Sequence, residues 1–144
     1  MENKDYYTNN SNVVELCADD FAGKKISNKN FAEKYGMIKA YAPWCGFCKR
    51  FKDDMNFLAN NLNKEGFIVG ALNCDKYKDL SKELGVPHYP YLFQVYPDGS
   101  IKPMELEGGR TIETVLKSIC KFTNENNKGN GKCCRKEGNK INCN

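Results

Sequence analysis

The sequence predicts an α/β protein whose central mixed β-sheet is flanked by helices on both faces. Short apolar runs alternate with stretches of helical periodicity, the pattern of strands joined by crossover helices. Two of the runs are separated only by a Pro-Asp-Gly-Ser turn at 97–100, which adds an antiparallel pair to the sheet. With 144 residues, 40% of them hydrophobic, the chain can bury one sizeable core.

Each expected element is bounded by residues that start or stop regular structure. Ser27 and Gly36 flank a short helix, Pro43 ends a mostly apolar strand, and Gly85 ends another helix. Two further stretches carry apolar residues at every third or fourth position, as amphipathic helices do. The expected strands are 12–17, 37–42, 67–74, 91–96 and 101–106, and the expected helices are 28–35, 44–63, 78–84 and 111–122.

The chain divides into three parts. Residues 1–11 form a polar N-terminal extension, 12–122 the folded domain, and 123–144 a basic tail rich in Asn, Gly and Cys. The tail carries five Lys or Arg against two Glu, and its one aliphatic residue is Ile141. Such a segment buries too little apolar surface to offset the entropy of ordering it, so we expect the tail to be flexible.

Composition excludes several classes of protein. Eight Phe, eight Tyr and one Trp exclude a wholly disordered chain. No apolar run approaches the roughly 18 residues that cross a bilayer, so we expect no membrane partner. The first ten residues are polar and carry no secretory signal, which predicts cytoplasmic synthesis. The basic tail lacks aromatic residues, so nucleic-acid binding is not favoured.

Two of the eight cysteines, Cys45 and Cys48, form a CxxC pair where a predicted central strand gives way to a helix. A thiol in the first helical turn faces unpaired N–H groups and the positive end of the helix dipole, which favours Cys45 as a nucleophilic thiolate. Cys48 lies three residues later on the same face, placed to attack Cys45 and resolve a mixed disulfide. Gly46 leaves room for a substrate strand, and Trp44 offers a flat apolar wall beside the sulfur.

A structural disulfide or half of a zinc site would also use such a pair. A structural bridge gains little by closing so short a loop. A zinc site needs four ligands, and neither His nor a second CxxC lies nearby. The pair therefore predicts redox chemistry without a metal, and the Cys45–Cys48 disulfide is the only redox group expected.

Several short segments resemble one family. They are residues 41–49 (YAPWCGFCK), 85–90 (GVPHYP), 98–99 (DG), 109–110 (GR), 13–16 (VVEL) and 19–21 (DDF). Together they resemble the thioredoxin superfamily, and the catalytic domains of protein disulfide isomerases more than thioredoxin itself. The resemblance covers residues 12–122. It implies a thioredoxin fold and a protein-disulfide oxidoreductase or isomerase, with cysteine-containing proteins as substrates and glutathione or another thiol oxidoreductase as electron partner.

The resemblance also assigns supporting residues. The bond between Tyr89 and Pro90 is expected to be cis, with Pro90 facing the dithiol and its neighbouring backbone pairing with the substrate peptide. Arg110 matches a mobile arginine that approaches the buried cysteine and eases its reoxidation. Without the resemblance, Pro90 is an ordinary strand-edge proline and Arg110 a solvated charge.

Phe47 departs from the family, which has His at this position in isomerases and Pro in thioredoxin. Phe cannot donate a hydrogen bond to the Cys45 thiolate, so the reduced form loses one stabilising contact. We therefore expect a reduction potential more negative than that of the isomerases, within about −270 to −180 mV.

Lys39 stands where the family has a buried acid that relays a proton for the second cysteine, and the usual lysine partner falls at Ala71. A buried, unpaired lysine is pushed toward neutrality and can serve as a base. Alternatively, Lys39 extends to water or finds another carboxylate, the interpretation that we favour.

Two further departures concern the helix and the site. Asp53 replaces a proline that kinks the family's active-site helix, which predicts a straighter helix. His88 replaces a frequent Gly and lies either beside the site or at the surface.

The other six cysteines have no assigned chemistry. Cys17, Cys74 and Cys120 are expected to be small buried apolar residues. The tail cysteines Cys133, Cys134 and Cys143 either pass electrons to the dithiol, crosslink to another molecule, or remain free thiols.

Two functions remain open at this point: a thiol–disulfide oxidoreductase, or an adaptor or packaging module that binds through its tail. The compartment is equally open. Isomerase-like residues indicate an oxidising compartment, whereas the polar start indicates the cytoplasm. The abundance of Asn and Lys suggests an AT-rich genome, and a virus-encoded copy retained in the virion would reconcile the two indications.

Overall fold

The computed structural model describes residues 5–7, 11–125 and 131–143. The parts of the expected N-terminal extension and flexible tail at 1–4, 8–10, 126–130 and 144 lie outside these described residues. Within the described chain, no helix is both long and apolar enough to cross a membrane.

A five-stranded sheet forms the centre of the molecule, in the order β1-β5-β4-β6-β7. The strands β1, β5 and β4 are parallel to one another. Strand β6 pairs antiparallel with β4, and β7 pairs antiparallel with β6, so the expected mixed sheet of a thioredoxin fold is confirmed. Its strands are β1 (Val14–Leu16), β4 (Gly36–Tyr41), β5 (Ile68–Asn73), β6 (Tyr91–Val95) and β7 (Ile101–Pro103). A small second sheet pairs β2 (Phe21–Ala22) with β3 (Lys25–Ile26).

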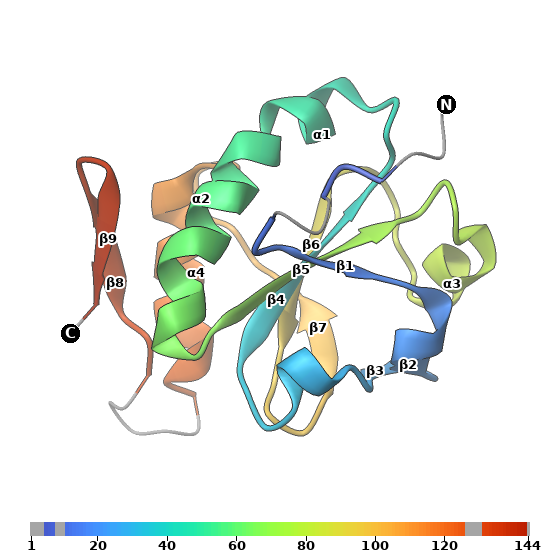
Figure 1. The fold of residues 1–144 in the computed structure, drawn as a ribbon, viewed down its shortest axis with the longest axis horizontal. Coiled ribbons are helices and arrows are strands. Elements are labelled where there is room, and N and C mark those ends of the chain that lie inside the picture. The colour runs from blue at the N-terminus through green and yellow to red at the C-terminus, as the bar shows by residue number, and fades with distance from the viewer. Residues whose placement is uncertain (1–4, 8–10, 126–130, 144) are drawn as a thin grey trace.

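Helices cover both faces of the sheet, as expected. Helices α2 and α4 lie on one side and α3 on the other (Figure 1). The helices are α1 (Gly46–Arg50), α2 (Lys52–Leu62), α3 (Lys78–Glu83) and α4 (Ile112–Thr123), and the short 3₁₀ turns are η1 (Ala18–Asp20), η2 (Lys29–Phe31) and η3 (Asn63–Glu65).

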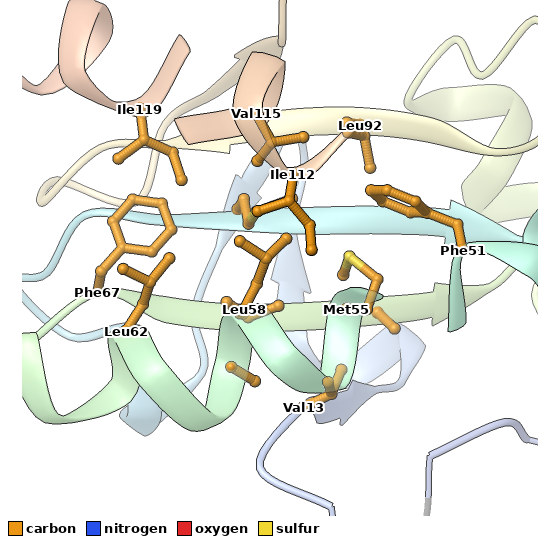
Figure 2. Close-up of a cluster of buried hydrophobic side chains, with 14 of the residues drawn as sticks. Val13, Phe51, Met55, Leu58, Leu62, Phe67, Leu92, Ile112, Val115 and Ile119 are labelled. Atoms are coloured by element: carbon orange, nitrogen blue, oxygen red, sulfur yellow. The ribbon is translucent and has the colours of Figure 1, made fainter. Parts of the chain in front are cut away.

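The larger core fills the space between the sheet and the α2–α4 layer. Figure 2 shows side chains of α2 and α4 packed toward one another on the same face of the sheet, over its central strands. Burial of a Leu, Ile or Met side chain stabilises the fold by roughly 1.5–3 kcal/mol. The labelled residues are Val13, Phe51, Met55, Leu58, Leu62, Phe67, Leu92, Ile112, Val115 and Ile119.

The predicted helix at 28–35 is wrong. Only the 3₁₀ turn η2 forms there, and β4 begins at Gly36 rather than after it. Glu33 adopts the left-handed conformation (φ 59°), which a helix cannot continue through. The Phe31 ring packs where Gly36 and Gly70 leave space, since an added Cβ at either would lie 2.8 Å from that ring. Tertiary packing therefore outweighs the local helical pattern.

The expectation of a straighter active-site helix is also wrong. The single helix predicted over 44–63 is divided at Phe51 into α1 and α2. Phe51 has φ −88° and ψ −1°, and its ring is buried. Asp53 and Asp54 then occupy the first turn of α2, where acidic side chains stabilise a helix N-terminus. The break therefore persists without a proline.

The tail has regular structure between residues 131 and 143. It forms a hairpin of β8 (Cys134–Glu137) and β9 (Lys140–Cys143) that lies beside α2 and α4 (Figure 1). Ile141 is buried in the larger core, and its N–H donates to Oδ1 of Asn61 at 3.2 Å. The hairpin buries little apolar surface, as its composition indicates, and covalent links attach it to the domain instead.

These links are disulfides between Cys120 and Cys133 and between Cys134 and Cys143. The expectation that Cys120 is simply a buried apolar residue is therefore wrong. Cys17 is partly exposed, so its expected burial is also wrong, whereas Cys74 is buried as expected. Both are free thiols.

Candidate active site

Cys45 lies at the end of the central strand β4 and caps the N-terminus of α1. Its backbone is extended (φ −77°, ψ 120°), and its Sγ accepts a hydrogen bond from the Cys48 N–H at 3.1 Å. The first N–H groups of a helix have no partner within the helix, so one of them is aimed at this sulfur. This hydrogen-bond donor is of the kind that a nucleophilic sulfur at a helix N-terminus would use.

The two thiols differ in environment. Cys45 is 6% exposed, whereas Cys48 is fully buried, and both are free thiols. Burial raises the pKa of Cys48 well above its ordinary value, and the hydrogen bond with Cys45 raises it further. Cys48 therefore holds its proton until a base removes it, which suits a second, resolving thiol.

Pro90 follows a cis peptide bond after Tyr89, as expected from the resemblance. Pro90 and Arg110 together line two neighbouring hollows, of about 350 and 280 Å³. The first also contains His88, which places this histidine beside the site. The second lies against Phe47 at the start of α1. Arg110 is exposed and stands between the two hollows.

Two large apolar side chains stay exposed beside Cys45. Trp44 is 57% exposed and Phe47 is 62% exposed, which is unusual for residues of this size. The Trp44 indole N–H donates to Asp75 at 3.2 Å, and the Arg50 guanidinium stacks on Phe47 at 4.3 Å. These contacts hold both rings at the surface, where they can meet apolar segments of another protein.

Gly46 keeps the space above α1 open. A Cβ built there would meet only the end of the Arg50 side chain, at 3.8 Å, among described atoms. Glycine is therefore not required by packing at this position. Its small size keeps the surface between the two cysteines accessible.

The interpretation that Lys39 reaches water or a carboxylate is wrong. Lys39 is fully buried, and its Nζ donates to the Tyr7 hydroxyl at 3.0 Å and to the Cys48 carbonyl at 2.9 Å. Burial lowers its pKa to about 8, although the nearby sulfurs of Cys48 and Cys45 favour the charged form. Lys39 and Ala71 are neighbours in the register of β4 and β5. Ala71 stands at the position where the resemblance places the family's lysine partner.

Aromatic rings take the place of a counter-ion around this amine. Four ring centroids lie within 5.4 to 5.7 Å of Nζ. Ring faces attract a cation, so they offset part of its desolvation cost. The rings belong to Tyr6, Tyr7, Tyr41 and Phe51.

Sequence reasoning missed Tyr6 and Tyr7, which lie near the dithiol, and Glu15, which contacts Tyr7. Tyr7 is only 3% exposed, although residues 1–11 were assigned outside the domain. The signal was a pair of tyrosines within an otherwise polar segment. Glu15 accepts hydrogen bonds from the Tyr41 hydroxyl at 2.8 Å and the Tyr7 N–H at 3.2 Å, and burial raises its pKa to about 8.

Comparisons with known proteins agree with this geometry. The family model for thioredoxin matches residues 12–121. The chain is 32% identical over 112 residues to a probable protein disulfide-isomerase A6 of Medicago sativa, covering 74% of this chain and 30% of that protein. It is 31% identical over 110 residues to protein disulfide-isomerase A6 of Mus musculus, covering 76% and 24%. The chain thus spans about a third or less of these curated relatives.

Solved structures give the same result. The first thioredoxin domain of mouse protein disulfide-isomerase A4 superimposes with a TM-score of 0.62 at 22% identity, covering 80% of this chain and 78% of that one. The Trx4 domain of ERdj5 superimposes with a TM-score of 0.58 at 25% identity, covering 76% and 93%. With its dithiol at the N-terminus of α1 beside a cis proline, the chain belongs to the thioredoxin family, and its relatives include protein disulfide isomerases.

Proposed function

We propose that this protein is a thiol–disulfide oxidoreductase that acts on protein disulfides through Cys45 and Cys48. The observation that carries the proposal is the Cys48 N–H donated to the Cys45 sulfur at 3.1 Å, at the cap of α1. The redox group is the cysteine pair itself, and the cycle requires no other cofactor.

The reaction proceeds by two exchanges. The Cys45 thiolate attacks one sulfur of a substrate disulfide, which forms a mixed disulfide and expels the other substrate sulfur as a thiolate. Cys48 then loses its proton and attacks the Cys45 sulfur, which forms the Cys45–Cys48 disulfide and expels the second substrate thiolate. Two electrons pass from the dithiol to the substrate, and the expelled thiolates take up protons. Glutathione or another thiol oxidoreductase then resets the pair.

Protein segments with exposed apolar side chains are the proposed substrates. Trp44 and Phe47 flank the dithiol segment in sequence and present exposed apolar surface. Phe47 lines one of the hollows at Pro90, and the Trp44 ring contacts Tyr89, the residue before Pro90. A partly unfolded chain offers both the disulfide and the apolar residues that this surface accommodates. The paired tail cysteines suit an oxidising compartment.

The alternative, an adaptor that binds a partner through its cysteine-containing basic tail, is left without free tail cysteines for a covalent link. Cys133, Cys134 and Cys143 are all paired within the chain and are not available to another molecule.

The test is reduction of insulin by dithiothreitol, followed by turbidity. Wild type should accelerate it, and Cys45→Ser should abolish the effect. When reduced Cys48→Ser is mixed with insulin without dithiothreitol, a mixed disulfide at Cys45 should accumulate and be detectable by mass, because the first exchange proceeds without the second. Cys74→Ser is the control, since Cys74 is buried and burial raises its pKa. Absence of any wild-type turnover would favour the adaptor. The reduction potential in glutathione buffers then separates an oxidising from a reducing role.

A further inference from the structure

Residues 5–7 cross the end of the sheet at which the active site lies. Figure 1 shows this segment below α1, beside the end of β4. Asp5 accepts hydrogen bonds from Asn73 at 3.1 Å and from Lys76 at 3.3 Å. One end of the segment is therefore attached to the last residue of β5 and to the chain that follows it.

The next residue is attached to the active-site strand itself. The Tyr6 N–H donates to the Tyr41 hydroxyl at 3.0 Å, and the Tyr6 hydroxyl donates to the Pro43 carbonyl at 2.9 Å. The rings of Tyr6 and Tyr41 stack with centroids 4.5 Å apart. Tyr6 thus spans the connection between β4 and Cys45.

Tyr7 completes the attachment and reaches the buried amine. Its N–H donates to Glu15 on β1, and its hydroxyl accepts from Lys39. Three consecutive residues are therefore bound to separate parts of the domain, although they lie outside the region that the family model covers. Segment 5–7 also supplies two of the four rings around the Lys39 amine.

The remaining charged and titratable groups around this amine are few. Glu15 lies on β1, the thiols belong to α1 and its cap, and the first turn of α2 adds one base and two acids. They are Glu15, Cys45, Cys48, Lys52, Asp53 and Asp54, together with the hydroxyls of Tyr6, Tyr7 and Tyr41. None forms an ion pair with Lys39 among the described residues.

We propose that segment 5–7 is part of the active site, and that Tyr7 is a positioning residue that holds the Lys39 amine at Cys48 and shields it from water. The inference rests on the proposed function. In the resolving step, the neutral amine takes the Cys48 proton and becomes an ammonium ion. The resulting thiolate forms the bond to Cys45 and breaks the bond between Cys45 and the substrate sulfur. Glu15 anchors Tyr7 and thereby fixes the segment.

Two physical arguments support this role. First, burial lowers the pKa of this amine to about 8, so it loses its proton more readily than a solvated lysine, although the surrounding rings and Glu15 favour the charged form. Second, the amine is bound to the carbonyl of Cys48 itself, so it is fixed beside the residue that must lose a proton. A base held in this way contributes about 100-fold or more to a proton-transfer step.

The first experiment measures shielding and needs no enzymatic activity. The folded chain is treated briefly with an acetylating reagent, and each lysine is quantified by peptide mass spectrometry. Lys39 should be protected relative to the exposed Lys78. Tyr7→Ala should increase its labelling more than about tenfold, whereas Tyr7→Phe, which keeps the ring, should not. Equal labelling of Lys39 and Lys78 in wild type would refute the shielding.

The second experiment measures positioning. A preformed mixed disulfide between Cys45 and a thiol peptide is allowed to resolve, and peptide release is followed from about pH 6 to pH 9. In wild type the rate should rise with pH and level off as the amine becomes neutral. Lys39→Met should slow release about 100-fold or more and remove that transition, and Tyr7→Phe should shift it.

Tyr96→Phe is the matched control. Tyr96 is a buried tyrosine whose hydroxyl also bonds two polar groups, Gln94 and Glu125, but near the opposite end of the sheet. The Tyr96→Phe variant should release the peptide with the same pH dependence as wild type. Wild-type profiles for Lys39→Met and Tyr7→Phe would overturn the proposal. Failure of Cys45 to form any mixed disulfide would instead overturn the proposed function, and the labelling pattern would still test segment 5–7.

Discussion

Glu15 on β1 and Lys39 on β4 both pair with Ala71 of β5, so a carboxyl and a fully buried amine occupy one row across three strands. In the family that the sequence resembles, the acid is expected at position 39 and the lysine at 71. Here the lysine stands at the acid's position, and the row's carboxyl lies on β1. They are linked through Tyr7, which bonds to both.

This row predicts a distinctive pH dependence of stability. Burial raises the pKa of Glu15 from 4.5 to about 8, so the folded state binds more protons than the unfolded state between these values. Stability contributed by the neutral carboxyl is therefore fully present below about pH 4.5 and is lost as pH rises toward 8, by roughly 4 kcal/mol. Urea unfolding at about pH 5 and pH 8 measures it. Glu15→Gln should lose this dependence, and identical curves for both proteins would contradict it.

Phe47 predicts the reduction potential. Phe47→His introduces a donor beside the Cys45 thiolate, and a hydrogen bond of about 1 kcal/mol corresponds to about 20 mV in a two-electron couple. The potential should become less negative by at least this amount. Phe47→Leu is the control, because it also removes the stacking with Arg50 but adds no donor. If the reduction potential of Phe47→His is as negative as that of Phe47→Leu, or more negative, the hydrogen-bond mechanism is excluded.

The hairpin predicts a second effect, on local stability. Replacing Cys134 and Cys143 together by Ser should release β8 and β9, since closing a loop of this length stabilises by roughly 2–3 kcal/mol. Tryptic cleavage after Arg135 and Lys136 should accelerate more than about tenfold under native conditions. Cys17→Ser serves as the control. Unchanged cleavage would mean that burial of Ile141 holds the hairpin without the bond.

Arg110 predicts an effect on reoxidation. It lies between the two hollows beside Pro90, so its charge faces any anionic oxidant that approaches the dithiol. Arg110→Gln should slow oxidation of the dithiol by glutathione disulfide several-fold, and the difference should shrink at high salt. Lys102→Gln makes the same charge change on β7 and should have little effect. A salt-independent difference would point to a role other than charge.

Much of the fold followed from local patterns. The alternation of apolar runs and amphipathic stretches predicted the five-stranded sheet, and the Cys45–Cys48 spacing predicted the thiol at the helix cap. The failures have a common cause. The 3₁₀ turn at Phe31, the break at Phe51 and the hairpin at Ile141 each depend on a partner distant in sequence. Periodicity within a segment carries no information about such partners.

The active site shows the same limit. The residues adjoining Cys45 in sequence were found from the sequence alone. The sequence alone does not decide whether Lys39 is buried, because its surroundings come from Tyr7, 32 residues earlier, and from Cys48 in α1, 9 residues later. The role of Glu15 was not visible, since a Glu in a strand reads as a solvated position until the covering segment is known.

The adjacent residues Cys133 and Cys134 form bonds in two directions, one to α4 and one to the end of β9. The polypeptide is therefore not a simple line at its C-terminal end but two covalent rings that meet at one peptide bond. A protease that cuts once within either ring leaves every fragment attached. Such a nicked molecule would gain one water in mass per cut and separate into pieces only after reduction. A band of full size on a non-reducing gel therefore does not show that the backbone is uncut in this region.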